Sequence, residues 1–353
     1  MLLTGKSILI TGGTGSLGKT LTNRILTNEL GKPSKVIIFS RDETKQHEMR
    51  VAYKNKQVAT DEIIYHNFDE LVEFYIGDVR NYHSIAAVLN DADFVFNTAA
   101  LKQVPTCEYF PYEAVSTNIC GPENMVRAIR ENKLPIDTVV GISTDKACKP
   151  VNVMGMTKAI QERIFITANL TVPSTRFICV RYGNVLASRG SVIPLFHSQV
   201  SAGGPVTITS DDMTRYLLSL NDAVDVIFTA LKEANPGETF IPRVPSAKMT
   251  DIAQILIGDR DIAIEVIGVR PGEKIHEILI SEEEVNRTVD RGEYYAIKSL
   301  LPELVTDPDE PLARSTEYSS ADGLMEIDGL RELLRKQDLL IPDTSSTEQE
   351  LLR

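Results

Sequence analysis

A glycine-rich turn between the first apolar run and the first helical pattern most restricts how this chain can fold. The stretch ILITGGTGSLGKTL places Gly12, Gly13, Gly15 and Gly18 between the two segments, and it fits both G-x-G-x-x-G and the wider T-G-x-x-G-x-x-G spacing. Glycine permits a tight turn and a close approach of the backbone to a ligand, and the free N–H groups at the helix start favour a pyrophosphate. Strand, turn and helix in this order predict a dinucleotide-binding site.

Short β-branched runs alternate with helical patterns through the first half of the chain. The expected strands are 7–12, 35–40, 72–77, 93–98, 137–143 and 176–183, and the expected helices are 16–29, 43–56, 80–89, 111–132 and 152–169. Residues 57–71 are expected to form an extended helix end and a loop insertion. The alternation predicts an α/β fold with a Rossmann-type doubly wound parallel sheet and right-handed crossovers.

The alternation breaks after Gly183, where loops rich in glycine and proline separate shorter elements. We expect residues 1–183 to form the dinucleotide-binding domain, with later segments returning to its sheet. Residues 184–338 are expected to form mainly a smaller carboxy-terminal substrate-binding lobe. Residues 339–353 are expected to form a polar tail, a candidate for disorder.

Composition restricts the partners of the chain. Its 353 residues are 42% hydrophobic and 24% charged, which is typical of a globular protein. A net charge of −12 argues against a broad nucleic-acid surface, so an anionic ligand needs a local basic pocket. The apolar stretch near the amino terminus is too short for a signal or membrane segment, and the four scattered cysteines are typical of reduced thiols in or near the core. We expect a cytoplasmic protein without a metal site, because its five histidines have no ligand spacing.

The end of the second expected strand bears on the choice between NAD and NADP. An NAD site usually offers a carboxylate there, whereas this strand ends in Ser40 and Arg41, with Lys45 one turn into the next helix. A guanidinium suits a 2′-phosphate through paired charge-assisted bonds, so we expect NADP. Asp42 leaves NAD open, and a surface arginine is the alternative. Asp78 is expected near the adenine edge or, alternatively, as the cap of the following helix.

The segment STDKACKPVNVMGMTK carries the candidate chemical groups. Thr144, Asp145 and Lys146 follow an expected strand, at the carboxyl edge where such sheets bind ligands. Met154 and Lys158 are four residues apart on the next helix and therefore share a face. They have the spacing of a Y-x-x-x-K pair with methionine in place of tyrosine, and methionine transfers no proton at neutral pH. Either the chain has lost its chemistry or other groups in this segment carry the protons.

These residues make the chain resemble the extended short-chain dehydrogenase/reductase family, in its branch of UDP-N-acetylglucosamine 4,6-dehydratases. The resemblance covers nearly the whole chain and includes ITGGTGSLGK, FSRDETKQ, GDVRNY, TAALKQVP, STDKACKPVNVMGMTK, RYGNVLASRGSVIPLF, MTRYLLSL and VRPGEKIHE. Met154 resembles a known branch of the family that includes dehydratases, so it does not by itself indicate a dead enzyme. Lys149 is a departure, because related sequences often carry a small or amide residue there.

The resemblance implies oxidation of the sugar at C4 by a tightly bound, recycled NADP, loss of water across C5–C6 and return of the hydride to C6. Asp145 is the candidate acid for the C6 oxygen and, through Thr144, takes the C4 hydroxyl proton. Lys146 is the candidate C5 base, provided that its pKa falls well below ~10.4. Lys158 is expected to bind the nicotinamide ribose, and Met154 to form a wall of the site. The alternatives are that Asp145 caps the next helix and that Lys146 is solvated.

The resemblance also implies a UDP-sugar pocket lined by arginines in an otherwise acidic chain. The expected substrate contacts are Lys102, Asn118, Asn184, Arg189, Val192, Pro194, Thr207, Thr209, Arg215, Arg270 and Glu273, and the remaining expected cofactor contacts are Thr14, Ser16, Leu17, Val79, Ala99 and Ala100. A surface ion pair is the alternative for each isolated charge. The resemblance alone implies a homo-oligomer, either a dimer or a hexamer.

Two other functions stay open. A nucleotide-sugar 4-epimerase would return the hydride to C4 and would not need Asp145 and Lys146 as an acid–base pair. A non-catalytic NADPH-binding regulatory protein is suggested only by Met154, and the retained Asp145, Lys146 and Lys158 argue against it. Whether C5 is also epimerised depends on a placement of Lys146 that spacing cannot supply.

Overall fold

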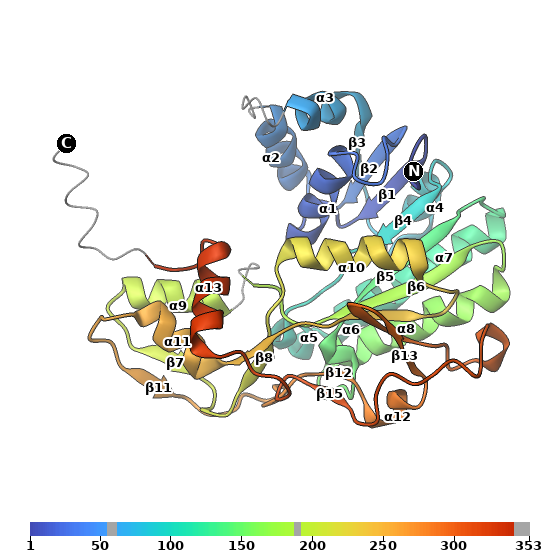
Figure 1. The fold of residues 1–353 in the computed structure, drawn as a ribbon. Helices are drawn as coiled ribbons and strands as arrows, with labels where there is room; N and C mark the ends of the chain where they lie inside the picture. Colours follow the sequence, from blue (N-terminus) through green and yellow to red (C-terminus); the bar gives the residue numbers. More distant parts are fainter. Residues whose placement is uncertain (55–61, 187–191, 342–353) are drawn as a thin grey trace. The chain divides into compact units, whose positions relative to one another are not determined.

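A computed structural model describes residues 1–54, 62–186 and 192–341, and within them the largest sheet has nine strands (Figure 1). Their order is β13-β14-β9-β6-β5-β4-β1-β2-β3. The bounds are β1 Ser7–Thr11, β2 Lys35–Ser40, β3 Val72–Ile76, β4 Phe94–Asn97, β5 Thr138–Thr144, β6 Arg176–Tyr182, β9 Thr239–Pro242, β13 Thr288–Arg291 and β14 Tyr294–Ile297. The strands from β3 through β9 pair in parallel, whereas β14 and β13 are antiparallel. The predicted doubly wound α/β fold is confirmed.

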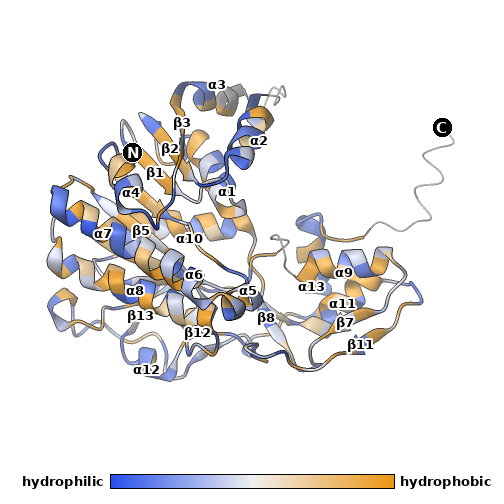
Figure 2. Cartoon of the chain, turned by 180° about the vertical axis from the view of Figure 1, so that it is seen from behind, coloured by the Kyte–Doolittle hydropathy of each residue, from blue (hydrophilic) through white to orange (hydrophobic). Residues whose placement is uncertain are grey.

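Helices cover both faces of this sheet. On one face α1 (Ser16–Leu26) contacts α10 (Leu220–Glu233), and on the other α4 (Tyr82–Leu89), α7 (Gly121–Asn132) and α8 (Val153–Thr171) pack together (Figures 1 and 2). The central strands are therefore buried on both sides, which is why they carry continuous apolar runs rather than an alternating pattern.

The prediction for residues 57–71 is wrong where the structure describes them. Residues 62–71 form a helix, α3 (Glu62–Leu71), rather than a loop, and it follows α2 (Glu43–Lys54). Phe68 is buried and stacks on Tyr53 of α2 at 4.2 Å between ring centroids. This packing provides the apolar contact that a short helix needs. Residues 57–61 lie outside the described part of the chain.

The expected helix 111–132 is divided into three pieces. A short helix, α5 (Val104–Tyr109), precedes α6 (Pro111–Val115), a π-turn follows at Ser116–Cys120, and α7 then continues to Asn132. A π-turn adds one residue to the helical repeat and so changes which side chains face the sheet.

The chain divides into two compact units. The first, here called the sheet unit, comprises Met1–Tyr182, Leu220–Arg243 and Ile278–Glu317, and the second unit comprises Gly183–Ser219, Val244–Glu277 and Tyr318–Arg353. The returning segments of the sheet unit contain α10, β9, β13 and β14, and also β12 (Ile278–Ile280), α12 (Glu282–Val285) and a 3₁₀ turn at Pro302–Leu304.

The second unit has an apolar core of its own. Its elements are α9 Val192–Ser201, β7 Val206–Ile208, β8 Thr214–Tyr216, β10 Ser246–Lys248, α11 Met249–Ile257, β11 Ile264–Val266, β15 Tyr318–Ser319 and α13 Ile327–Lys336. β7 pairs with β11 and β8 pairs with β10. The core includes Phe196 of α9, Ile252 of α11 and Leu330 of α13, so residues far apart in sequence stabilise this unit.

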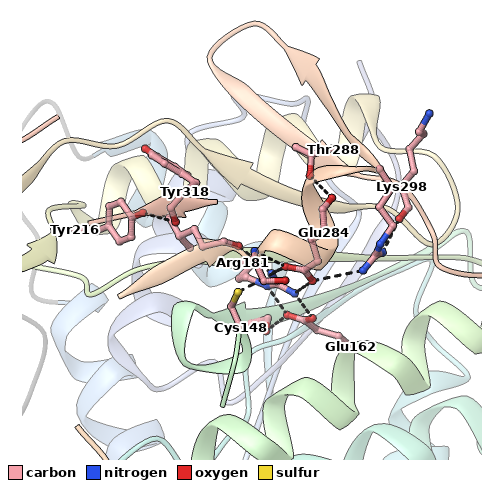
Figure 3. A network of polar contacts seen from close by, with 12 residues as sticks. Cys148, Glu162, Arg181, Tyr216, Glu284, Thr288, Lys298 and Tyr318 are labelled. Carbon is pink, nitrogen blue, oxygen red and sulfur yellow. Dashed lines mark hydrogen bonds and ion pairs between the residues drawn. The ribbon is translucent and has the colours of Figure 1, made fainter. Parts of the chain in front are cut away.

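A buried ion network ties β6 to α8 and to α12 within the sheet unit (Figure 3). The guanidinium of Arg181 donates to both oxygens of Glu162, at 3.0 and 2.7 Å, and to both oxygens of Glu284, at 2.7 and 2.9 Å. The hydroxyl of Ser143, on β5, also donates to Glu162. Burial by itself would raise the pKa of Glu284, but the charge and hydrogen bonds of Arg181 lower it to about 2. The network therefore joins the ends of β5 and β6 to a segment that returns from 100 residues later.

We expect Arg181→Met to lower the free energy of unfolding by about 3–5 kcal/mol at pH 7, because it leaves the buried carboxylate of Glu162 without its cation and leaves Glu284 only the more distant Arg287, at 3.7 Å. The loss should shrink as the pH falls, because protonation removes the unpaired charges. Urea unfolding between pH 5 and 7 measures both effects. Arg335→Met, which breaks an exposed pair with Glu332, is the control and should cost less than about 1 kcal/mol. Equal losses in the two variants would contradict this account.

Candidate active site

The glycine turn lies at the end of β1, which has β2 on one side and β4 on the other. This reversal of strand order is where open α/β sheets bind ligands. Gly12 has a φ of +68°, and a Cβ atom there would lie 2.9 Å from the backbone of Ala99, which precedes Ala100 in the half-buried stretch after β4. A Cβ on Gly18 would lie 2.5 Å from the Cα of Gly13. Both positions therefore require glycine if the turn is to pack this closely.

The amino terminus of α1 is suited to an anion. Gly15 is its N-cap residue, and among the described residues no side chain caps the helix. The first turn, which begins with Ser16 and Leu17, contains no acidic residue, and Thr14 is buried in the turn. The N–H groups of a first helical turn have no partner within the helix and carry the positive end of its dipole. The residues therefore fit a dinucleotide pyrophosphate.

The end of β2 is followed by a guanidinium and by a carboxylate that is engaged at the start of α2. Asp42 accepts hydrogen bonds from the backbone N–H of Lys45, at 3.0 Å, and from its ammonium, at 2.5 Å, and these bonds lower the pKa of Asp42. Asp42 thus caps α2. Arg41 is half exposed and lies 3.6 Å from Asp78, while Ser40 is buried. Both groups that bear on cofactor choice keep access to solvent, with 51% of the Arg41 side chain and 39% of the Asp42 side chain exposed, but Asp42 is already engaged by Lys45.

Asp78 does not cap α4, so that alternative is wrong. The cap is Asn81, whose side chain accepts from the N–H of Ser84 at 3.0 Å. Asp78 instead accepts from the backbone N–H of Arg80, at 3.0 Å, and from its Nε, at 2.8 Å. Burial would raise the pKa of Asp78, but the bonds from Arg80 outweigh it and lower the pKa. Val79 is buried beside this turn.

Three proton-bearing side chains meet where β5 ends. Asp145 Oδ1 accepts from the Thr144 hydroxyl at 2.7 Å and from the Lys146 ammonium at 3.1 Å. Asp145 is fully buried, whereas the Lys146 side chain keeps 21% of its exposure. A hydroxyl, a carboxylate and an amine in mutual contact can pass protons to one another and to a bound substrate.

The simpler alternatives for these residues do not hold. The cap of α8 is Asn152, which accepts from the N–H of Gly155 at 2.8 Å, and not Asp145. Lys146 is not a freely solvated lysine, because it is ion-paired with Asp145. Asp145 begins a short 3₁₀ turn, Asp145–Ala147, whose N-cap is Thr144. The turn carries both charged groups toward the carboxyl edge of the sheet.

Lys158 is buried on α8, and burial lowers its pKa to about 8 even though Cys179 and Glu162 act in the opposite direction. Its ammonium donates to Gln161 Oε1 at 2.7 Å. A lysine with this pKa changes charge close to neutral pH, which is typical of a functional site.

Met154 is also buried, in a small apolar cluster with Cys107 and Ala114. Its carbonyl accepts a hydrogen bond from Thr157 at 2.8 Å. The side chain therefore packs within the protein.

Asn118 supports the loop that carries Lys102. It lies in the π-turn, is fully buried, and both accepts from the N–H of Leu101, at 2.8 Å, and donates to its carbonyl, at 2.9 Å. A third bond, at 3.0 Å, reaches the hydroxyl of Thr157 on α8. Lys102 itself is exposed, and partial desolvation lowers its pKa. Asn118 thus links α8 to the backbone next to Lys102.

The second unit contains the other expected substrate residues that the structure describes, and Arg189 lies outside that part. Thr209 donates to Glu273 at 3.2 Å, and Arg270 lies 3.9 Å from Glu273 with 55% of its side chain exposed. These three residues are brought together. Thr207 is engaged by Gln199, at 2.7 Å.

Arg215 supports the segment that carries Arg270. It is buried and donates to the carbonyls of Lys274, at 3.0 Å, and Ile275, at 3.1 Å. Its guanidinium therefore holds the backbone of the RPGEK segment. The remaining expected residues are Asn184, half-buried in the loop after β6, and Val192 and Pro194 in the first turn of α9.

Two features of the site escaped the sequence analysis. The first is the Arg181 network, and its signal was an arginine inside the apolar run RFICVRY, since a charge in a buried strand needs a buried partner. The second is Gln161, whose signal was its position three residues after Lys158 on the same helix. Neither signal shows the whole contact, because Glu162 and Glu284, which bind Arg181, and the carbonyl of Ile142, which binds Gln161, come from other elements.

Among the described residues, no group of three or more His, Cys, Asp and Glu side chains could hold a metal ion. No described helix is both long and apolar enough to cross a membrane. The cysteines are free thiols, and Cys107, Cys148 and Cys179 are buried. Cys120 is exposed, contrary to the expectation, because it lies on the solvent side of the π-turn.

The sequence matches the polysaccharide biosynthesis protein family over residues 8–299. The chain belongs to this family. Within it, the chain is similar to a UDP-glucose 4-epimerase of Rickettsia bellii, with 46% identity over 297 residues that cover 83% of this chain and 82% of that protein.

Solved structures agree with this family at the level of the fold. Pen from Bacillus thuringiensis matches with a TM-score of 0.84 and 34% identity, over 96% of this chain and 100% of Pen. DesIV from Streptomyces venezuelae, a dTDP-glucose 4,6-dehydratase determined with NAD bound, matches with a TM-score of 0.63 and 18% identity, over 76% of this chain and 86% of DesIV. This family member thus has the same Rossmann-type fold as these two proteins.

The protonation of Lys158 can be isolated with Lys158→Met. Because the pKa in the folded protein is about 8 instead of 10.5, the folded chain binds fewer protons than the unfolded chain between these values. The stability of the wild type relative to Lys158→Met should therefore rise with pH across this window, by on the order of 2–3 kcal/mol. Urea unfolding of both proteins from pH 7 to 10.5 measures the difference. A difference that does not change with pH would contradict the lowered pKa.

Proposed function

We propose that this family member is a nucleotide-sugar 4,6-dehydratase. It converts UDP-N-acetylglucosamine to a UDP-4-keto-6-deoxy-N-acetylhexosamine, with or without inversion at C5. The observation that carries the proposal is the contact of Thr144, Asp145 and Lys146 at the end of β5. A 4-epimerase moves a proton at one oxygen only, whereas an elimination also needs a base at C5 and an acid at C6. An aspartate and a lysine 3.1 Å apart supply that additional pair.

Each proton then has a carrier. Thr144 passes the C4 hydroxyl proton to Asp145, and Asp145 gives it to the departing C6 hydroxyl as water. Lys146, in its neutral form, takes the C5 proton and later returns a proton to C5. A bound nicotinamide cofactor supplies the hydride chemistry, from C4 and back to C6. Lys158 binds the ribose and stabilises negative charge at O4, and Met154 lines the site.

The cofactor is proposed to be NADP. The glycine turn and the start of α1, which no side chain caps among the described residues, support a dinucleotide, because a helix amino terminus of this kind suits a pyrophosphate. Arg41 supports the 2′-phosphate because it is half exposed, while Asp42 is occupied as the cap of α2.

Arg41→Ala should raise the Kd for NADPH about 10–100-fold, because it removes charge-assisted hydrogen bonds to the 2′-phosphate. The Kd for NADH should change less than about twofold, and this titration is the internal control. Cofactor fluorescence measures both affinities. An equal loss for the two cofactors would show that Arg41 does not read the 2′-phosphate.

In the second unit, Arg270 is proposed to bind the diphosphate and Thr209 with Glu273 to line its site. The exposure of Arg270 supports this role. Arg215 is proposed to act through the backbone of the segment that it holds rather than as a phosphate ligand.

A 4-epimerase is the second candidate. It is favoured by the name of the Rickettsia bellii relative, a UDP-glucose 4-epimerase that is 46% identical over 297 residues. In an epimerase, Thr144 and Asp145 would serve the C4 hydroxyl alone, and Lys146 would have no proton to remove from carbon.

Turnover in D2O separates the two candidates. The purified chain is incubated with NADP+ and UDP-N-acetylglucosamine, with UDP-glucose in parallel. We expect a product lighter by one water, with one solvent deuterium at C5 and no net NADPH, and its NMR couplings report the C5 configuration. Recovery of only the C4 epimer, without deuterium, would overturn the dehydratase in favour of the epimerase. Absence of any product would overturn both.

A pair of variants checks the roles within the same assay. Lys146→Ala should lower kcat by about 10²–10⁴-fold, the range expected for loss of a general base. Met154→Leu conserves volume at a packing position and should retain activity within about tenfold. Equal losses would contradict the division of roles.

A further inference from the structure

We propose that Gln161 is a positioning residue for Lys158, whose neutral amide holds the ammonium against β5 without adding a charge beside it. The contact stands on the structure alone, whereas its consequence for cofactor binding and turnover rests on the proposed function. Gln161 is fully buried on α8. A buried polar side chain of this kind is costly unless its hydrogen bonds are made.

Both ends of the amide are engaged. Oε1 accepts from the Lys158 ammonium at 2.7 Å, and Nε2 donates to the carbonyl of Ile142 at 3.0 Å. Only this orientation fits, because turning the amide over would set its NH2 group against the ammonium and its oxygen against the carbonyl. Ile142 lies on β5, two residues before Thr144. The amide thus ties Lys158 to the strand that leads into the Thr144–Asp145–Lys146 cluster.

The charged groups around Lys158 are otherwise matched to partners of their own. Glu162, the next residue on α8, is held by Arg181 and Ser143 (Figure 3). The thiol of Cys179 on β6 faces Lys158, but burial raises its pKa and keeps it neutral.

Charged side chains on two further elements packed on α8 also have partners other than Lys158. Asp145 and Lys146 on the 3₁₀ turn are paired with each other. Glu108 on α5 accepts from the N–H of Val153 at 2.7 Å. Two adjacent residues of α8 therefore bind different buried cations. The carboxylate of Glu162 binds Arg181, and the amide of Gln161 binds Lys158.

A neutral partner has a specific consequence. It fixes the direction of the ammonium but does not favour the charged form as a carboxylate would, so Lys158 can change charge near neutral pH. An ammonium has three donors, and the bond to Gln161 takes one of them. With the ammonium already fixed by this bond, less ordering is required when its other donors bind a ligand.

The first test needs no activity. Wild type, Lys158→Met, Gln161→Glu and the double variant are unfolded in urea from pH 7 to 11. The contribution of Lys158 to stability is the difference in free energy of unfolding between the proteins with and without Lys158→Met. In the wild-type background this difference should rise with pH from about 8. In the Gln161→Glu background the pH window of this rise should start at least one pH unit higher. An unchanged window would overturn the proposal. Gln254→Glu, an exposed position on α11, is the matched control and should leave the window where it is.

Gln161→Met tests the same contact by removing the hydrogen-bond acceptor of Lys158 while it keeps the length of the side chain. We expect the window to begin at least half a pH unit lower, and the Kd for NADPH to rise about three- to tenfold at pH 7, by fluorescence titration. An unchanged Kd together with an unchanged window would overturn the positioning role.

The pH at which kcat/KM falls on the alkaline side should follow the pKa of Lys158. It should move to higher pH in Gln161→Glu and to lower pH in Gln161→Met. If the chain has no dehydratase activity, the unfolding window still reports on the contact, so the two proposals fail separately. A shifted window with an unshifted limb would show that Gln161 sets the charge of Lys158 but not its use in turnover.

Discussion

The pairing of Arg181 with Glu162 and Glu284 is the interaction on which the rest of the candidate site depends. It lies at the carboxyl ends of β5 and β6, directly before Thr144 and the turn that carries Asp145. Buried charges are stable only when they are paired, since each one alone would incur a large desolvation cost, and Arg287, 3.7 Å from Glu284, adds a second cation to the set. The network therefore requires that α8, β6 and α12 be present together before the carboxyl edge of the sheet takes its shape.

Helix α8 then carries two buried side chains with opposite requirements. Glu162 is paired with the permanent cation of Arg181, while Lys158, which is proposed to change its charge, is bound by the neutral amide of Gln161. Placing these residues one helical turn apart separates a structural charge from a titrating one. With methionine at position 154, the proposed proton carriers lie in the turn after β5 and not on the helix.

Much of the fold followed from residue patterns. The alternation of continuous apolar runs with helical patterns through the first half of the chain predicted a doubly wound sheet, because a strand covered on both faces tolerates few polar residues. Helix α3 was missed, because its stabilisation comes from the stacking of Phe68 on Tyr53, which no local propensity reveals. The functional candidates along STDKACKPVNVMGMTK were identified from spacing, but their contacts were not.

The sequence by itself determined the chemistry that is available to this protein: a glycine turn that only glycine can form, an arginine at the end of β2, and a hydroxyl, a carboxylate and an amine in consecutive positions. Only the tertiary structure decided how those groups are used. It turned Asp42 into a cap and left Arg41 accessible, it assigned Asn118 and Arg215 to support backbone, and it set Gln161 against Lys158. The physical reason is that hydrogen bonding and desolvation depend on neighbours from other elements, which folding brings together and sequence spacing does not specify.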